Sequence, residues 1–196
     1  ARPDERVSRL PLVTEAERSA WPAPRPTQVI TSVPSQLAER AKRDANAVAA
    51  LVGEKSWTWA ELSRRAASVS ARLRASGLKS GATVAVCLPP SPDKLAVLWG
   101  VLEAGGAVVA LGATDLGRLS TYASQDAATP LLITWRGVVT SSKLDASRVL
   151  YVEDLETATS VSAGVTRAEA PAWLLPSGAN QPAWTLDHHA LADLFT

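Results

Sequence analysis

Residues 176–189, PSGANQPAWTLDHH, come nearest in this chain to a set of side chains that could do chemistry. Ser177 and Gly178 begin a short polar turn, Pro182 ends it, and a histidine pair follows. A Ser-Gly turn ahead of a helix presents backbone N–H groups to phosphate oxygens, but such a loop also needs a cation and several glycines. No lysine or arginine follows Arg167, and Gly178 is the single glycine of the stretch. The stretch therefore has the outline of a phosphate loop without most of its chemistry.

The ionisable residues around this loop have alternative interpretations. His188 and His189 could form a metal pair or a base, but adjacent helix positions do not face one side, and no third ligand lies nearby in the sequence. We interpret them as the polar first turn of a helix, with Asp187 as its N-cap rather than a general base. Asp93 and Lys94 are likewise expected to be first-turn surface residues.

The elements that must position the loop follow from apolar runs. Strands are expected at 47–52, 83–88, 107–111, 130–134, 148–152 and 172–175. Helices are expected at 34–45, 58–77, 91–104 and about 115–124, with a last one from about 187. Strands that are apolar throughout and alternate with helices predict an α/β fold, a mostly parallel sheet that is flanked by helices and covered on both faces. Ligands of such sheets bind at the carboxyl ends of the strands, where this loop lies.

The helix at 58–77 has the clearest pattern. Thr58 and Glu61 have the spacing of a capping box, and Gly77 is a natural stop. Apolar residues recur at helical spacing, namely Leu62, Ala66, Val69 and Leu73. Its four arginines could bind an acidic partner, but a solvated helix face is the simpler interpretation; they are Arg64, Arg65, Arg72 and Arg74.

Composition limits the function classes. A net charge of +1, with 46% hydrophobic and 20% charged residues, gives no electrostatic case for nucleic acid or an anionic membrane as partner. No apolar run reaches the length of about 18 residues that spans a membrane, and ARPDERVSRL lacks the apolar segment of a signal peptide, so we expect a cytoplasmic protein. The lone Cys87 is expected to be a buried small hydrophobe. Because the chain has no methionine, we expect an excised segment of a longer protein.

The chain divides into two parts. Residues 1–33 contain prolines throughout and are expected to be an interdomain linker with one short helix near LVTEAERSAW. Residues 34–196 form the regular part. Of the seven tryptophans, Trp57, Trp59 and Trp99 are core candidates, and any exposed ones would indicate a surface that packs on a neighbouring domain.

Several segments resemble a known family. WTWAEL at 57–62 is similar to its Leu-Thr-Tyr-x-Glu-Leu motif, and VLEAGGAVVALGATD at 101–115 to its Leu-Lys-Ala-Gly-x-Ala-Tyr-Val-Pro-Ile-Asp motif. LSTYASQDAATPLLIT at 119–134 matches the segment that follows, and LPLVTEAER at 10–18 resembles the linker from a condensation domain. On these motifs the chain resembles the N-terminal part of an adenylation domain of a nonribosomal peptide synthetase, a member of the adenylate-forming enzyme superfamily.

The resemblance implies what the loop should contain. The family's phosphate loop reads Thr-Ser-Gly-Ser-Thr-Gly-x-Pro-Lys-Gly-Val, with a histidine a few residues later. Ser177 and Gly178 match, Pro182 matches if one residue is missing before it, and His188 or His189 takes the histidine position. The departures are Pro176 for Thr, Ala179 and Asn180 for Ser-Thr, Gln181 for Gly, Ala183 for Lys and Trp184 for Gly.

In this family ATP and a carboxylate form an acyl-adenylate, and the acyl group then passes to a carrier-protein thiol. The loop losses predict that this chain has no catalytic or metal residues and binds neither ATP nor Mg, leaving Ser177, Gly178 and Pro182 as remnants. The family's domains are also much longer, and the amino-acid pocket, the adenine and ribose contacts and the lid lysine would lie beyond this chain.

The prediction is a non-catalytic, truncated adenylation-domain remnant that acts as a spacer or docking platform between condensation and downstream domains, including carrier-protein domains. The alternative is the N-terminal fragment of an active or interrupted adenylation domain that uses ATP and Mg to activate an amino acid. A third interpretation is a module that binds a trans-acting adenylation enzyme or a small accessory protein.

Overall fold

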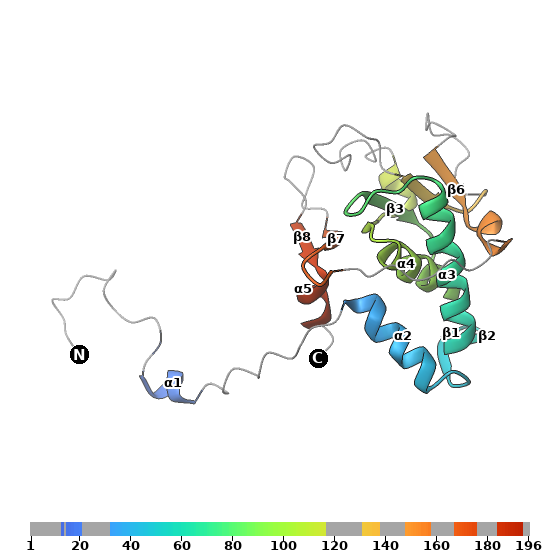
Figure 1. Cartoon of the computed structure of the whole chain (residues 1–196). Coiled ribbons are helices and arrows are strands. Elements are labelled where there is room, and N and C mark those ends of the chain that lie inside the picture. The colour runs from blue at the N-terminus through green and yellow to red at the C-terminus, as the bar shows by residue number, and fades with distance from the viewer. Residues whose placement is uncertain are drawn as a thin grey trace.

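The centre of the fold is a six-stranded sheet (Figure 1). The computed structural model describes residues 13, 15–20, 32–116, 131–137, 148–157, 167–175 and 184–193. The sheet has the order β6-β5-β3-β4-β7-β8, and every neighbouring pair is parallel except β7–β8. This confirms the predicted α/β fold with a mostly parallel sheet. The strands are β3 (Thr83–Cys87), β4 (Ala107–Ala110), β5 (Leu131–Thr134), β6 (Val149–Tyr151), β7 (Pro171–Leu175) and β8 (Trp184–Asp187).

Strand β3 shows why these runs are apolar at every position. All five of its residues are buried, since β4 and β5 pair with it on either side and both faces are covered. Val84 and Val86 point into the cluster that includes the helices, whereas Ala85 and Cys87 belong to the cluster on the opposite face. Burial raises the pKa of the Cys87 thiol, which confirms the prediction that this cysteine is a buried small hydrophobe.

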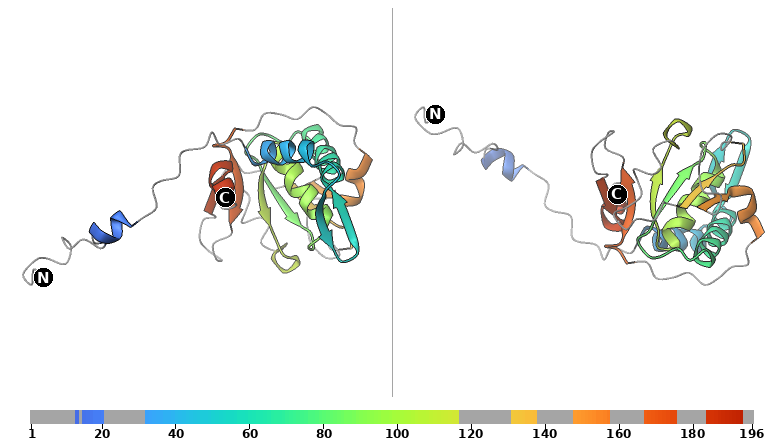
Figure 2. Two further views of the ribbon diagram at one scale, coloured as in Figure 1. Left: turned by 90° about the horizontal axis from the view of Figure 1, so that it is seen from below. Right: turned by 90° about the horizontal axis from the view of Figure 1, so that it is seen from above.

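The described helices lie together on one side of the sheet (Figure 2). They are α2 (Val33–Arg43), α3 (Trp59–Ala75), α4 (Pro92–Glu103), the 3₁₀ helix η4 (Val152–Thr157) and α5 (His188–Asp193), while α1 (Glu15–Ser19) lies in the N-terminal region. On the other face, the described chain contributes Leu116 of the turn at 113–116. The helix expected at about 115–124 lies mostly outside the described residues.

Helix α3 begins as its sequence predicts. The backbone N–H of Thr58 donates to Glu61 Oε2 at 2.8 Å, and the N–H of Glu61 donates to Thr58 Oγ1 at 3.3 Å, so the capping box is complete. Its predicted apolar residues are buried, and Gly77 follows its C-cap with φ of 76°. The chain enters α3 from a hairpin of β1 (Val48–Val52) and β2 (Lys55–Thr58). Strand β2 was not predicted, because it is short and its residues are exposed or half-buried.

Helices α3 and α4 touch at a glycine. A Cβ atom built on Gly100 would lie 2.5 Å from Val69 Cβ and 2.6 Å from the backbone oxygen of Ala66. The two helix backbones can therefore approach each other here only because position 100 has no side chain. Arg65 and Arg74 add polar contacts across the same interface, to Asp93 and to the backbone oxygen of Glu103.

Replacing Gly100 by alanine should therefore destabilise the fold by about 1–3 kcal/mol, since the added methyl group must push α3 and α4 apart. Denaturant unfolding of the wild type and of Gly100→Ala measures this difference. Gly137→Ala is the matched control, because a Cβ at Gly137 meets no atom within 4 Å and should change the free energy by no more than about 0.5 kcal/mol. Equal effects of the two substitutions on the free energy of unfolding would contradict a close contact between α3 and α4 at Gly100.

Candidate functional site

The predicted phosphate loop is carried by a β-hairpin. Strands β7 and β8 pair antiparallel, with Leu174 opposite Thr185 and Leu175 opposite Trp184. Residues 176–183, which include Ser177, Gly178 and Pro182, lie outside the described residues. The sequence predicted a strand, a loop and then a helix. That order is wrong in one respect, since strand β8 stands between the loop and α5.

The loop starts from the edge of the sheet where its ligands were expected. Strand β7 runs parallel to β4, so its carboxyl end at Leu175 points the same way as those of β4 and β3. Described polar side chains just after the neighbouring strands form hydrogen bonds with nearby backbone N–H groups. Ser91 Oγ accepts from the N–H of Lys94 at 3.1 Å, and Asp115 Oδ2 accepts from that of Gly112 at 3.3 Å. These groups shape the edge of the sheet, because their hydrogen bonds hold local turns.

One cation at this edge is held by a carboxylate. Arg136, after β5, bonds both carboxylate oxygens of Asp154 at 2.6 Å and stacks on the ring of Tyr151 at 4.6 Å. The Asp154 carboxylate raises the pKa of Arg136, which stays charged. Arg136 is therefore directed toward η4 rather than presented as a phosphate ligand.

The histidine pair is split between the interior and the surface. His188 is fully buried, and its Nδ1 and Nε2 atoms have no hydrogen-bond partner among the described residues, while the side chain of His189 is exposed. The prediction of a polar first turn is thus wrong for His188. Burial lowers the pKa of His188, and the neighbouring Asp187 carboxylate partly opposes this shift. The ring is therefore neutral at pH 7.

The burial of His188 had a signal in the sequence. Leu191 and Ala192 stand three and four residues later, so they share a helix face with His188, and both are buried. Reading that periodicity would have put His188 on the apolar face. The N-cap prediction is confirmed, since Asp187 Oδ1 accepts from the N–H of Ala190 at 2.7 Å.

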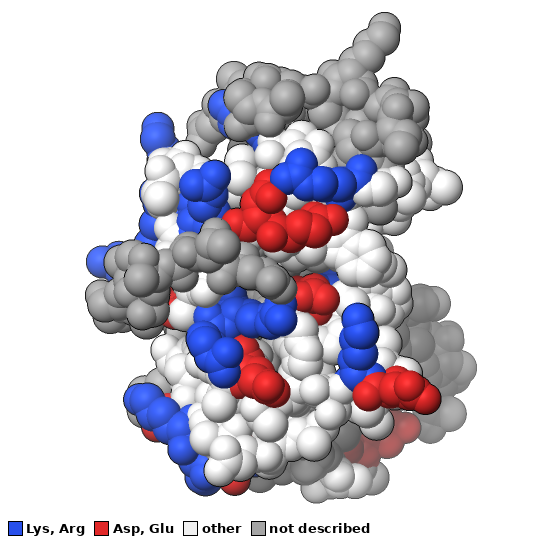
Figure 3. Space-filling model, turned by 90° about the vertical axis from the view of Figure 1, so that its right-hand side faces the viewer, with Lys and Arg blue, Asp and Glu red and all other residues white. Residues whose placement is uncertain are grey.

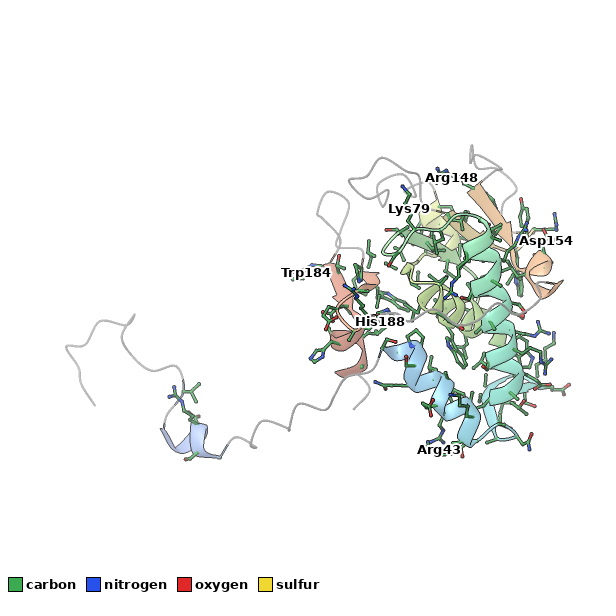
Figure 4. All side chains as sticks on the ribbon, viewed as in Figure 1. Arg43, Lys79, Arg148, Asp154, Trp184 and His188 are labelled. Atoms are coloured by element: carbon green, nitrogen blue, oxygen red, sulfur yellow. The ribbon has the colours of Figure 1, made fainter. Side chains whose placement is uncertain are left out.

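Trp184 lies at the start of β8 rather than in the loop. Its side chain is 70% exposed and, as Figure 4 shows, it lies on the outer side of the hairpin. Paired with Leu175, which is 44% exposed, it forms an apolar pair at the sheet edge. Trp99, in contrast, is buried in α4 as predicted.

Two further predictions are partly wrong. Asp93 is half-buried and pairs with Arg65 at 3.2 Å, and Lys94 is also half-buried, so neither is a simple surface residue. Of the arginines of α3, Arg64 and Arg72 are exposed, as a solvated face requires, but Arg65 also stacks on Trp57 at 4.2 Å. The face shown in Figure 3 carries both signs of charge side by side. It therefore offers no broad basic surface for an acidic partner.

The described residues include no group of three His, Cys, Asp or Glu side chains that could hold a metal ion. None of the helices in the described part of the chain is long and apolar enough to cross a membrane.

Comparison with known proteins agrees with the fold and identifies the family. The family model of AMP-binding enzymes matches residues 37–192, and the chain therefore belongs to this family. A linear gramicidin synthase protein of Brevibacillus parabrevis is 30% identical over 191 residues, covering 88% of this chain. Surfactin synthase subunit 1 of Bacillus subtilis is 29% identical and covers 98%. The predicted resemblance to adenylation domains of nonribosomal peptide synthetases is confirmed.

Solved structures show the same fold. The nonribosomal peptide synthetase FmoA3 in its AMPPNP-bound form superposes with a TM-score of 0.79 at 22% identity, covering 93% of this chain and 20% of FmoA3. The N-terminal subdomain of Klebsiella oxytoca NpsA has a TM-score of 0.70 at 23% identity, covering 84% of this chain and 43% of that structure. This chain spans only 4% of the gramicidin synthase protein and 6% of the surfactin synthase protein. It corresponds to an adenylation-domain fragment.

The buried neutral His188 makes the stability depend on pH. The unfolded chain binds a proton at the ordinary histidine pKa of 6.5, but the folded chain binds it only at lower pH. The stability that depends on the neutral His188 ring is fully present above pH 6.5. As the pH falls below 6.5, the free energy of unfolding decreases by up to ~1.4 kcal/mol per pH unit. Urea unfolding at pH 7.5, 6.5 and 5.5 should show a weaker pH dependence for His188→Leu than for the wild type.

The comparison is made between the wild type and His188→Leu at each pH. The informative quantity is the difference in pH dependence between the wild type and the variant. Carboxyl groups also titrate in both proteins, such as Glu103, because burial raises the pKa of its carboxyl group. A wild-type profile that is parallel to that of His188→Leu would show that His188 is not buried as a neutral ring.

Proposed function

We propose that this chain is a non-catalytic adenylation-domain remnant of a nonribosomal peptide synthetase, and that it serves as a structural spacer and docking platform. The observation that carries the proposal is the sequence of the loop between β7 and β8. It has Ala183 where the family has the phosphate-binding lysine and Gln181 where it has a glycine. Strands β7 and β8 join the two ends of this loop, and the loop sequence lacks most of the groups that would bind phosphates.

Electrostatics support this proposal. Binding a triphosphate without a cation leaves several negative charges to be stabilised by backbone N–H groups and hydroxyls alone. From residue 168 to the end the chain has no lysine or arginine, and the loop's single hydroxyl is that of Ser177. The side chains of Ala179 and Gln181 also restrict the close backbone approach that glycine allows. The residues present in the loop do not fit MgATP.

The docking role is supported by the exposed apolar side chains. Leu175 and Trp184 lie next to each other on the edge hairpin, while Val48 and Leu51 of β1 are 62% and 67% exposed. Apolar groups gathered on a surface usually mark an interaction site. The partners we propose are the condensation and carrier-protein domains of the same synthetase. A trans-acting adenylation enzyme or a small accessory protein is a further candidate.

A second candidate function is the N-terminal part of an active or interrupted adenylation domain. The observation that favours it is coverage, because the chain corresponds to 43% of the NpsA N-terminal subdomain. A complete core could therefore be formed together with other polypeptide. In that case an amino acid would be activated with ATP and Mg for loading on a carrier protein.

Calorimetric titration with MgATP tests the proposal. We expect no saturable binding to the wild type and measurable binding to Ala183→Lys, since a charge-assisted contact to phosphate strengthens affinity about tenfold or more. Ala75→Lys is the matched control, because it adds the same charge at the exposed end of α3. Saturable binding of MgATP to the wild type, or amino-acid-dependent ATP–pyrophosphate exchange by the natural polypeptide through this domain, would overturn the non-catalytic role.

A further inference from the structure

We propose that β7, β8 and α5 form a unit that detaches from the sheet and unfolds while the rest of the fold stays intact. In Figure 1 these three elements stand together at one side of the molecule. Because they are consecutive in the chain, they can leave the sheet together without drawing the other strands after them. Protein regions open as cooperative units of this kind where few interactions join them to the core.

The ladder that joins this unit to the sheet is short. Strand β7 pairs with β4 through one pair of partner residues, Val108 and Trp173, whereas β3 has four such pairs with β4 and four with β5. Each further pair in a parallel ladder would add backbone hydrogen bonds that resist separation. The sheet is therefore most easily divided between β4 and β7.

Backbone hydrogen bonds link the parts of the unit to each other. Strands β7 and β8 have four pairs of partner residues. The N–H of His188 donates to the backbone oxygen of Ala170 at 3.3 Å, and that of His189 donates to Ala168 at 3.1 Å. The three elements depend on each other for their pairing, so they should be released together. A two-stranded hairpin is only marginally stable by itself, and the released unit should therefore unfold.

A cavity of about 440 Å³ lies along the boundary between the unit and the rest of the fold. Trp173, Leu191 and Ala192 line it from the unit, and residues of α2, α3 and α4 line it from the other side. A cavity removes the van der Waals contacts that would otherwise join its walls. Packing across this boundary is therefore incomplete.

Buried polar groups without partners also weaken the docked state. Both ring nitrogens of His188 and the Nε1 atom of Trp99 are buried and have no hydrogen-bond partner among the described residues. His188 shares a helix face with Leu191, which packs into the core cluster, so its ring faces the rest of the fold. Detachment would let water reach these groups, and they would gain hydrogen bonds that the docked state lacks.

Apolar burial holds the unit in place. Ala172 and Leu191 are buried in the core cluster and Trp173 packs against it, so the docked state predominates. The unit carries the exposed pair Leu175 and Trp184, and its release would therefore remove that surface without unfolding the core. This behaviour is independent of the non-catalytic role proposed for the domain, because it follows from pairing and packing alone.

Native-state hydrogen exchange, followed by NMR on this chain, tests the proposal. We expect the amides of β7, β8 and α5 to share one opening constant, at least about tenfold larger than that of the slowest amides in β3 and β5. Low concentrations of urea should accelerate their exchange with a common slope, because a cooperative opening exposes surface. Protection equal to that of β3 and β5 would overturn the proposal. Opening constants that differ from amide to amide and do not respond to urea would also overturn it.

The substitution Ile133→Val separates local from global unfolding. Ile133 is buried in β5, which β3 and β4 separate from the unit. Loss of its methyl group should accelerate exchange of the slowest β3 and β5 amides about fivefold. The amides of β7, β8 and α5 should be unchanged, since they exchange without unfolding of β5. Equal acceleration of both sets would show that the fold opens as one unit and would overturn the proposal.

The substitution His188→Leu tests the boundary itself. It should slow exchange of the β7, β8 and α5 amides at least about fivefold, because leucine buries no unpaired polar atom there. Thr185→Leu is the control within the same unit, since this side chain is exposed and its replacement should change exchange by about twofold or less. Unchanged or faster exchange of these amides in His188→Leu would contradict the proposal.

Discussion

The close contact of α3 and α4 at Gly100 is the constraint on which the rest of this fold depends. Helix α4 connects β3 to β4 and covers them, so its position follows from the sheet. Helix α3 touches the sheet cluster only if it can lie directly against α4, which the missing Cβ of Gly100 permits. The hairpin β1–β2, helix α2 and η4 all pack against α3. A wider spacing between the two helices would therefore displace the whole helical side of the domain.

The same contact borders an apolar cavity of about 440 Å³. Trp99 stands next to Gly100 in α4 and lines this cavity together with residues of α2, α3, β7 and α5. Trp99 belongs to the small cluster that joins α2 and α3, and Leu102 to the large cluster on the sheet. The cavity therefore lies between two parts of the core that are each well packed. The buried Nε1–H of Trp99 is left without a partner in the described chain.

The elements that the sequence predicted correctly are those whose signal is local. Strands β3 to β7 are continuous apolar runs, and α3 carries its cap, its periodicity and its stop within 20 residues. Strand β8 and strand β2 could not be found in this way, because WTLD and KSWT are short and mixed, and they are strands only through pairing with β7 and β1. The loop was predicted to lie at the carboxyl end of β7. This prediction needs only the order and direction of the strands. The burial of His188 was indicated by Leu191 and Ala192 on the same helix face, but the polarity of histidine favoured a surface position.

Stability and chemistry are separable in this domain. The core of the described residues consists largely of apolar side chains from strands β3, β4, β5 and β7 and from helices α3, α4, η4 and α5. The hairpin itself is held by its own ladder and by the α5 residues that pack behind it. Within the described part of the chain, the core is therefore formed by regular strands and helices. A fold of this kind can keep its shape and its surfaces after its loop has lost the groups that bind a nucleotide, which is the condition that a structural role in a larger synthetase requires.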